Sequence, residues 1–295
     1  MDIDFFTLLA AFGGGIFGAA LGATPAFIFT GFAVLIGVAV AAGGGGNDFL
    51  TGIAFGPFFG PHTSFAGGVA AAAYAAKRGY LATGRDGGTS LMGLNRPDVL
   101  VVGGMFAAGG YLIQRGFEAA ALGPWTDTIA LTVVTSGVIA RLMFGSTGLL
   151  GKVAAGGARF TPTDEACYVR WQEQPGQLLV IGFGLGLSSA YAANLLGADR
   201  GGDVVGFGIA AATLVFIQFG SKVPVSHHIA LPAAVATLVT GNILIGAGFG
   251  VVGAFAGEFW SRAIHIHGDT HIDPPAAAIA TSILLIRVGQ SAGLM

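Results

Sequence analysis

The stretch that decides the fold class is PAFIFTGFAVLIGVAVAAG, residues 25–43, which contains no charged side chain. A helix that spans a membrane needs about 20 mostly apolar residues, so this stretch predicts one. Charged residues make up only 9% of the 295-residue chain, hydrophobic residues make up 54%, and the mean hydropathy is +0.77. Soluble domains carry roughly 25% charged residues, and a surface this apolar would aggregate in water. We therefore predict an integral membrane protein with no soluble domain of any size.

Similar apolar stretches recur along the whole chain and predict an all-α, polytopic bundle of about ten transmembrane helices. The predicted helices are residues 5–22, 25–43, 62–77, 98–118, 127–146, 176–197, 203–220, 226–243, 244–261 and 273–290. Residues 49–60 (FLTGIAFGPFFG) are apolar but too short to span, and glycines and a proline interrupt them. Such a segment is tolerated at membrane depth only where protein or a water-filled cavity surrounds it, so we predict a re-entrant or broken segment.

Two related halves are predicted on either side of a polar stretch. Matching residues share one offset of 146 positions, namely Asp127 with Asp273, Thr135-Ser136 with Thr281-Ser282, and Arg141 with Arg287. Chance similarity between Ala/Gly-rich helices is the alternative. We predict a five-helix repeat at 1–146, a cytoplasmic linker at 147–175 and a second repeat at 176–295. An odd number of helices per half makes the second copy inverted, as in many transporters.

The positions of basic residues predict the orientation in a cell's inner or plasma membrane. Ten lysines and arginines fall on one side of the predicted bundle: Lys77, Arg78, Arg85, Arg96, Arg141, Lys152, Arg159, Arg170, Lys222 and Arg262. Only Arg115, Arg200 and Arg287 fall on the other side. Because cytoplasmic loops are enriched in these residues, we expect both termini outside.

Glycine is frequent, at 52 residues, and often recurs every fourth position, as in Gly14, Gly18 and Gly22. Small residues at this spacing share one helix face and allow close helix–helix contact. The GxGxxG spacings at 13–18 and 248–253 lie inside apolar helices without a preceding strand, so a dinucleotide site is excluded there.

Polar residues beside helix starts are the candidates for a solute pathway. They are His62, Thr63, Ser64, Asp127, Ser226, His227, His228 and Asp273. Neutral imidazole offers one hydrogen-bond donor and one acceptor, which suits a small polar solute. The alternatives are structural: the aspartates would cap helix N-termini, and the histidines would be buried and bonded to the backbone.

The segment HIHGDTHID, residues 265–273, holds the densest group of metal-ligating side chains, which are His265, His267, Asp269 and His271 with Asp273. Imidazole and carboxylate suit zinc, nickel or iron. A divalent metal is thus the one cofactor that the sequence suggests, and a solvated loop is the alternative.

Two segments resemble the urea-transporter family: Leu91-Met92-Gly93-Leu94-Asn95 with the helix after it, and Thr270 through Pro274-Pro275 to Thr281. The resemblance implies two inverted halves of five helices assembled as trimers. A different polytopic membrane family is the alternative.

Carboxylates and basic residues avoid the middle of the predicted helices, unlike those of ion-coupled carriers. The function that fits is a channel or facilitative transporter for a small neutral or weakly polar solute. Phenylalanines of residues 55–60 and 206–220 would supply an apolar constriction. The expected partners are the lipid bilayer, the solute and further copies of the chain in a homo-oligomer, but not nucleic acid. A membrane subunit without a pathway, and a metal-dependent enzyme using the 265–273 loop, are the alternatives.

Overall fold

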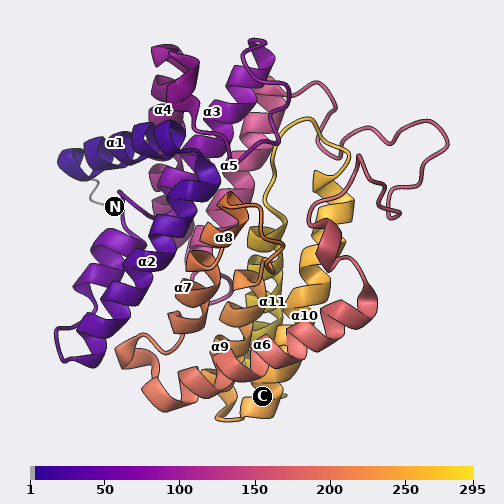
Figure 1. The fold of residues 1–295 in the computed structure, drawn as a ribbon. Coiled ribbons are helices and arrows are strands. Elements are labelled where there is room, and N and C mark those ends of the chain that lie inside the picture. Colours follow the sequence, from indigo (N-terminus) through magenta and orange to yellow (C-terminus); the bar gives the residue numbers. More distant parts are fainter. Residues whose placement is uncertain (1–3) are drawn as a thin grey trace.

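The computed structural model describes residues 4–295 and confirms that they form an all-α bundle (Figure 1). Eleven α-helices lie in the described part of the chain: α1 Phe5–Leu21, α2 Ala23–Ala42, α3 Ala66–Lys77, α4 Pro97–Ala119, α5 Thr128–Phe144, α6 Pro175–Leu196, α7 Val205–Ala212, α8 Val215–Gln218, α9 His227–Thr240, α10 Ile243–Trp260 and α11 Pro274–Ser291. Their positions follow the predicted stretches closely. Short π-helical turns, η1 Leu50–Ala54, η2 Pro61–Phe65 and η6 Ser261–His265, interrupt or extend the helices.

Local signals in the sequence explain where several helices begin. The Asp4 carboxylate accepts a hydrogen bond from the Thr7 N–H at the start of α1, and the Asn242 amide oxygen caps α10. Prolines occupy the first turns of α4, α6 and α11. Side-chain oxygens and prolines are favoured there because the first N–H groups of a helix have no partner inside it.

Five segments are long and apolar enough to cross a membrane, which indicates a multi-pass membrane protein. They are Ala23–Ala42, Pro97–Ala119, Pro175–Leu196, Ala198–Gln218 and Ile243–His265. Three further apolar helices, α1, α5 and α9, are shorter. The coarse prediction of a polytopic membrane protein therefore holds, although only half of the ten expected spans have the length and composition of full spans.

Two predicted elements differ from simple helices. The predicted helix at 203–220 divides into α7 and α8, because Leu214 and Phe216 donate backbone hydrogen bonds to the third preceding residue and so tighten the chain. Residues 49–60 form a broken segment as expected. It consists of η1 followed by a turn, and the Thr30 hydroxyl of α2 donates to the Phe59 carbonyl at 2.6 Å.

The helices pack as two similar groups joined by two helix pairs. In the first half α1, α3 and α4 pack on one another, and in the second half α6, α9 and α10 do the same. Between the halves, α2 packs on α7 and α5 packs on α11. Glycines permit the close approach, as the sequence predicts. A Cβ on Gly18 of α1 would lie 2.0 Å from the Ser64 carbonyl oxygen, and one on Gly250 of α10 would lie 2.5 Å from that of Gly182.

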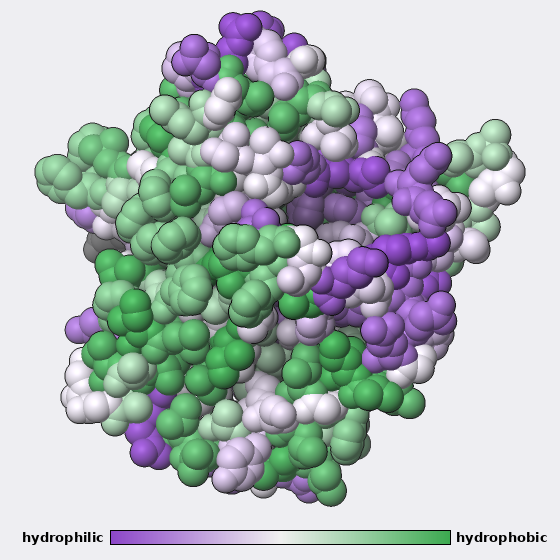
Figure 2. All heavy atoms as spheres, viewed as in Figure 1, coloured by the Kyte–Doolittle hydropathy of each residue, from purple (hydrophilic) through white to green (hydrophobic). Residues whose placement is uncertain are grey.

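The long polar segment lies over one end of the bundle. The Trp171 indole donates to the Val223 carbonyl, and Gln172 exchanges hydrogen bonds with the Val225 backbone. The 145–174 segment extends to the right in Figure 1, and hydrophilic residues gather on that side in Figure 2, whereas hydrophobic residues cover much of the lower and left surface. The predicted linker is thus packed against the helices at residues 168–172.

Candidate functional site

A cavity of about 580 Å³ lies among α2, α5, α7, α9 and α11. Residues of the broken segment 49–60, of the turn η2 and of the polar segment 145–174 also line it. Most of the lining side chains are apolar, with a smaller set of polar and charged groups among them. A mostly apolar cavity with a few polar groups is typical of small-molecule sites.

The two aspartates predicted at equivalent helix starts both line this cavity. The Asp127 carboxylate accepts from the Ala130 N–H at 2.7 Å, and Asp273 accepts from the Ala276 N–H at 2.8 Å. The predicted capping role is therefore confirmed, and it coexists with a place in the cavity wall.

Helices α5 and α11 each begin beside the middle of the other. The Thr126 hydroxyl, just before α5, donates to the Ala280 carbonyl of α11 at 2.8 Å. Gly137, in the middle of α5, lies against the backbone of His271 and Ile272, just before α11. The N-terminus of α11 is therefore buried inside the protein, and that of α5 is partly buried against α11.

Aromatic rings form a continuous wall of the cavity. Phe207 of α7 lies 5.7 Å, between ring centroids, from both Phe27 of α2 and Phe55 of the broken segment. Phe27 also contacts Phe65, at 5.7 Å, and the imidazole of His227, at 4.7 Å. Of the phenylalanines predicted to form an apolar constriction, only Phe55 and Phe207 meet in this wall. Phe216 and Phe219 are 51% and 80% exposed, and Phe58 and Phe59 pack against Phe17.

A second polar cluster lies at the start of α11. The His271 Nε2 is 3.1 Å from the Asp273 carboxylate, and the His271 ring is 4.7 Å from that of His265, between centroids. Tyr168, from the polar segment, lies 4.9 Å from the His265 ring. Burial raises the pKa of the Tyr168 phenol well above its usual value, and the Asp273 charge acts in the same direction.

The other predicted pathway residues are not part of the cavity wall. The hydroxyls of Thr63 and Ser64 donate to backbone carbonyls of the preceding turn, so they stabilise the start of η2. His62, Ser226 and His228 are buried within the bundle. Of the three histidines, only His227 lines the large cavity.

The predicted metal-ligating residues of the 265–273 loop are engaged with different partners. His265 Nδ1 is 3.1 Å from the Ile272 carbonyl oxygen, and His267 Nε2 is 2.9 Å from that of Arg159. Within residues 4–295, no three His, Cys, Asp or Glu side chains come together in a way that could hold a metal ion. The metal hypothesis therefore has no preformed ligand set to support it.

Asp269 shows how this loop is anchored. Its carboxylate accepts hydrogen bonds from the Ser146 N–H at 2.6 Å, the Ser146 hydroxyl at 2.8 Å and the Thr147 hydroxyl at 2.8 Å. Partial burial by itself would raise the pKa of Asp269, but these hydrogen bonds outweigh it and hold the pKa below its usual value.

Arg141 of α5 also binds the 265–273 loop. Its side chain is 1% exposed, and its guanidinium donates to the Thr270 hydroxyl and carbonyl and to the carbonyls of Leu149 and Ile264. A buried charge is tolerated only when its donors are satisfied, and here backbone oxygens satisfy them. This contact closes the bundle beside the cluster at the start of α11.

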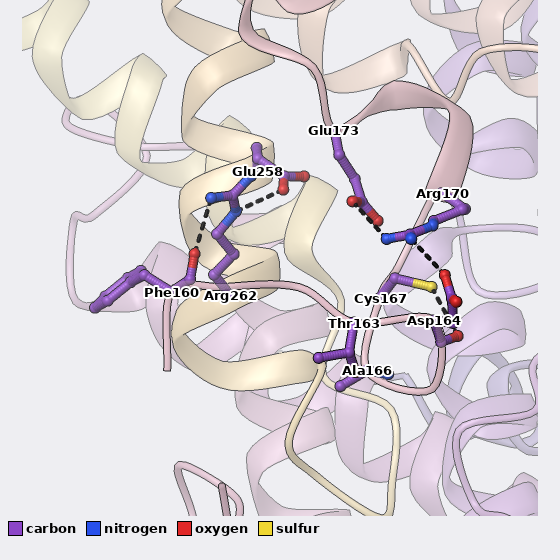
Figure 3. Close-up of polar contacts among 9 residues, drawn as sticks. All are labelled: Phe160, Thr163, Asp164, Ala166, Cys167, Arg170, Glu173, Glu258 and Arg262. Carbon is purple, nitrogen blue, oxygen red and sulfur yellow. Dashed lines mark hydrogen bonds and ion pairs between the residues drawn. The ribbon is translucent and has the colours of Figure 1, made fainter. Parts of the chain in front are cut away.

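Surface ion pairs fasten the polar segment (Figure 3). Arg170 binds the carboxylates of Glu173, at 3.1 Å, and Asp164. Arg262, which pairs with Glu258 at 2.6 Å, also donates to the Phe160 carbonyl at 2.9 Å. The pairs of the half-exposed Arg170 contribute little stability individually. The Arg262–Glu258 pair is partly buried, and the Arg262 contact with Phe160 helps to position the segment that carries Tyr168.

The cavity residues that were not predicted from the sequence include Tyr168, Trp171, Asp203 and Arg287. Tyr168 and Trp171 are aromatic residues in an otherwise polar stretch, a signal that could have indicated a packed segment. No local pattern marks Asp203, which precedes α7.

The comparisons with known proteins assign a family but no activity. They found no matching curated protein and no matching solved structure. The resemblance to the urea transporters, and the trimer that it implied, find no support in them. One family model, described as a family of unknown function (DUF7973), matches residues 1–174 and 165–295. Since these matches cover the whole chain, the protein belongs to the DUF7973 family.

Proposed function

We propose that the protein is a channel or facilitative transporter that moves a small solute across a membrane through the central cavity. The observation that carries the proposal is the cavity itself. It is large enough for a small molecule, and its wall includes α2 and α7, which belong to segments long and apolar enough to cross a bilayer. Ionisable groups inside a membrane bundle are costly to keep and commonly mark solute or ion pathways.

The helix starts around the cavity support the same function. Helices α5, α9 and α11 and the turn η2 all contribute residues of their first turns to its wall. Many transporters place their site where discontinuous helices begin near the middle of the membrane.

The proposal includes an inverted repeat, with α1–α5 corresponding to α6–α11. Support comes from matching packing contacts in the two halves. A Cβ on Gly110 of α4 would lie 2.0 Å from the His62 carbonyl oxygen, and one on Gly253 of α10 would lie 2.2 Å from that of His228. These contacts pair His62 with His228.

The proposed orientation places the basic loops in the cytoplasm. Backbone contacts join residues 84 and 269–271, and 152 and 267, so three of these loops meet at one end. At the opposite end Asn47 donates to the Asp199 carbonyl. The end with the basic loops would face the cytoplasm, following the positive-inside rule.

Uptake into proteoliposomes tests the function. Labelled small neutral, anionic and cationic compounds would be screened, and the variant Ala276→Leu would then be measured with any solute that enters. Ala276 is 5% exposed and lines the cavity, so a leucine should obstruct it. Uptake should fall at least about tenfold, the effect of a barrier increase of about 1.4 kcal/mol.

Ala39→Leu is the matched control, because Ala39 is an exposed position of α2. It should transport like the unaltered protein. The proposal is wrong if no compound enters faster than it enters empty liposomes, or if folded Ala276→Leu transports at the full rate.

A further inference from the structure

We propose that the solute of the central cavity is a small organic cation of the alkylammonium type, with Asp203 as the residue that binds its charge. The inference rests on the proposed function, because it names the class of molecule that the same cavity would take. It departs from the sequence-based expectation of a neutral or weakly polar solute, because the ligand proposed here carries a positive charge.

The charged groups of the cavity do not neutralise one another. Four of its lining residues carry formal charges, namely Asp127, Asp203, Asp273 and Arg287. The Arg287 guanidinium donates to the Gln290 amide, and it forms no ion pair within the described residues. Three carboxylates and one guanidinium thus leave a formal excess of negative charge.

Asp203 is the cavity carboxylate that neither caps one of the α-helices nor contacts a cationic or imidazole group; within the described residues its only hydrogen-bonding neighbours are the backbone N–H groups of Asp203 and Val204. Asp127 and Asp273 cap helix N-termini, whose partial positive charge stabilises them, and Asp273 also contacts His271. Asp203 forms no ion pair with any residue between 4 and 295. An unpaired carboxylate in a mostly apolar cavity is costly, and a bound cation would compensate it.

The aromatic wall and this carboxylate line the same cavity. Asp203 lies in the turn just before α7, and Phe207 lies in the first turn of that helix. Phe207 in turn contacts Phe27, Phe55 and the His227 imidazole, which lies 5.8 Å away between centroids. Faces of aromatic rings attract organic cations, and cages of such rings recognise alkylammonium groups.

His227 adds a hydrogen-bonding group to the same wall. The side chain is 6% exposed, and its Nδ1 is buried with no hydrogen-bond partner in the described part of the chain. An imidazole nitrogen can accept a hydrogen bond from an ammonium N–H. The cavity therefore combines an unpaired carboxylate, an aromatic wall and a free imidazole nitrogen.

Other ligand classes fit this combination less well. A bare metal ion would need several converging ligands, and the described residues hold no such group. An anion would meet three carboxylates and a single guanidinium. A neutral solute would leave the Asp203 charge uncompensated.

Binding to the purified full-length chain in detergent tests the inference. The probes are tetramethylammonium and ethylammonium, compared with uncharged 2,2-dimethylpropan-1-ol and anionic pivalate at matched ionic strength. Tryptophan fluorescence reports binding because Trp171 lines the cavity, and the shift in Tm gives a second readout. The ammonium ions should bind and raise Tm, while the alcohol and pivalate should not.

Two variants with matched controls locate the site. Asp203→Asn should weaken ammonium binding at least about tenfold, equivalent to about 1.4 kcal/mol, whereas Asp199→Asn, at an exposed position of the same loop, should not. Phe207→Leu should also weaken binding, and Phe216→Leu, at a residue that is 51% exposed, should leave it unchanged. If Asp203→Asn does not fold, the comparison of Phe207→Leu with Phe216→Leu still tests the site.

The outcomes separate this inference from the proposed function. Equal binding of the alcohol or pivalate, no binding of either ammonium ion, or full binding by folded Asp203→Asn and Phe207→Leu would overturn the cation site. If ammonium ions bind at Asp203 but never enter proteoliposomes, the site stands and the transport function fails. If another solute is transported and blocked by Ala276→Leu while ammonium ions do not bind, the function stands and the cation site fails.

Discussion

Adjacent glycines in α4 provide a matched test of how closely the helices pack. A Cβ on Gly110 would lie 2.0 Å from the His62 carbonyl oxygen, whereas a Cβ on Gly109 would meet no atom within 4 Å. Real Cβ contacts are rarely shorter than 3.0 Å, so Gly110→Ala requires a shift of about 3.0 − 2.0 = 1.0 Å between backbones. Close-packed interiors do not accommodate such a shift without cost.

The magnitude follows from comparing the two variants. Replacing a helical glycine by alanine favours the helix by about 1 kcal/mol, and this gain is common to both. Overpacking costs typically about 1–3 kcal/mol and applies only to Gly110. Gly110→Ala should therefore be less stable than Gly109→Ala by about 1–3 kcal/mol.

Unfolding in detergent micelles, by titration with a denaturing detergent, measures that difference directly. The same pair exists in the second half, where a Cβ on Gly253 would lie 2.2 Å from the His228 carbonyl oxygen and one on Gly248 would meet nothing. Equal stability of Gly110→Ala and Gly109→Ala would refute the close contact. If alanine destabilised the protein at Gly110 but not at Gly253, or the reverse, the two halves would not be structurally equivalent.

Three further predictions concern the polar end of the bundle. Single cysteines placed beside Arg85 or Arg159, with Cys167 replaced, should resist an impermeant thiol reagent in intact cells; ready labelling from outside would reverse the orientation. The folded-state pKa of Asp269 is lowered, so its stabilising contribution is present above the unfolded pKa of about 3.9 and is lost as pH falls through the lower folded value. Asp269→Asn should therefore lower Tm near neutral pH and weaken the dependence of Tm on pH in the acid range, and an unchanged acid dependence would contradict this. Arg141→Met should lower the unfolding free energy by at least about 1–3 kcal/mol, because buried carbonyl oxygens lose their donor; a stable variant with an unaltered loop would show that Arg141 is dispensable.

The helices and the membrane class could be predicted because their causes are local. The run at 25–43 is apolar and uncharged over the length of a span, and the chain forms α2 there. Asp127 and Asp273 cap their helices as predicted, because a carboxylate before a helix binds N–H groups only three residues away. The break at 49–60 likewise follows from its own glycines and proline.

The composition of the cavity depended on contacts between residues distant in the sequence. Tyr168 and Trp171, from the stretch expected to be a linker, line the cavity because Trp171 and Gln172 bond to the backbone before α9. Sequence pattern could not separate His227, which lines the cavity, from His62, which does not, since both precede small-residue helices.

The hydrogen-bond partners of the 265–273 loop also depended on the tertiary structure. Its residue types suit a metal, but His267 and Asp269 bind partners more than 100 residues away in the sequence, Arg159 and Ser146. The sequence alone determined which residues are helical and that apolar surface must be covered by lipid or protein, because hydrogen bonding within a helix and hydrophobic burial depend on local composition. Only the tertiary structure decided which polar groups meet in the cavity and which remain unpaired, because those outcomes depend on how closely glycine-bearing helices approach one another.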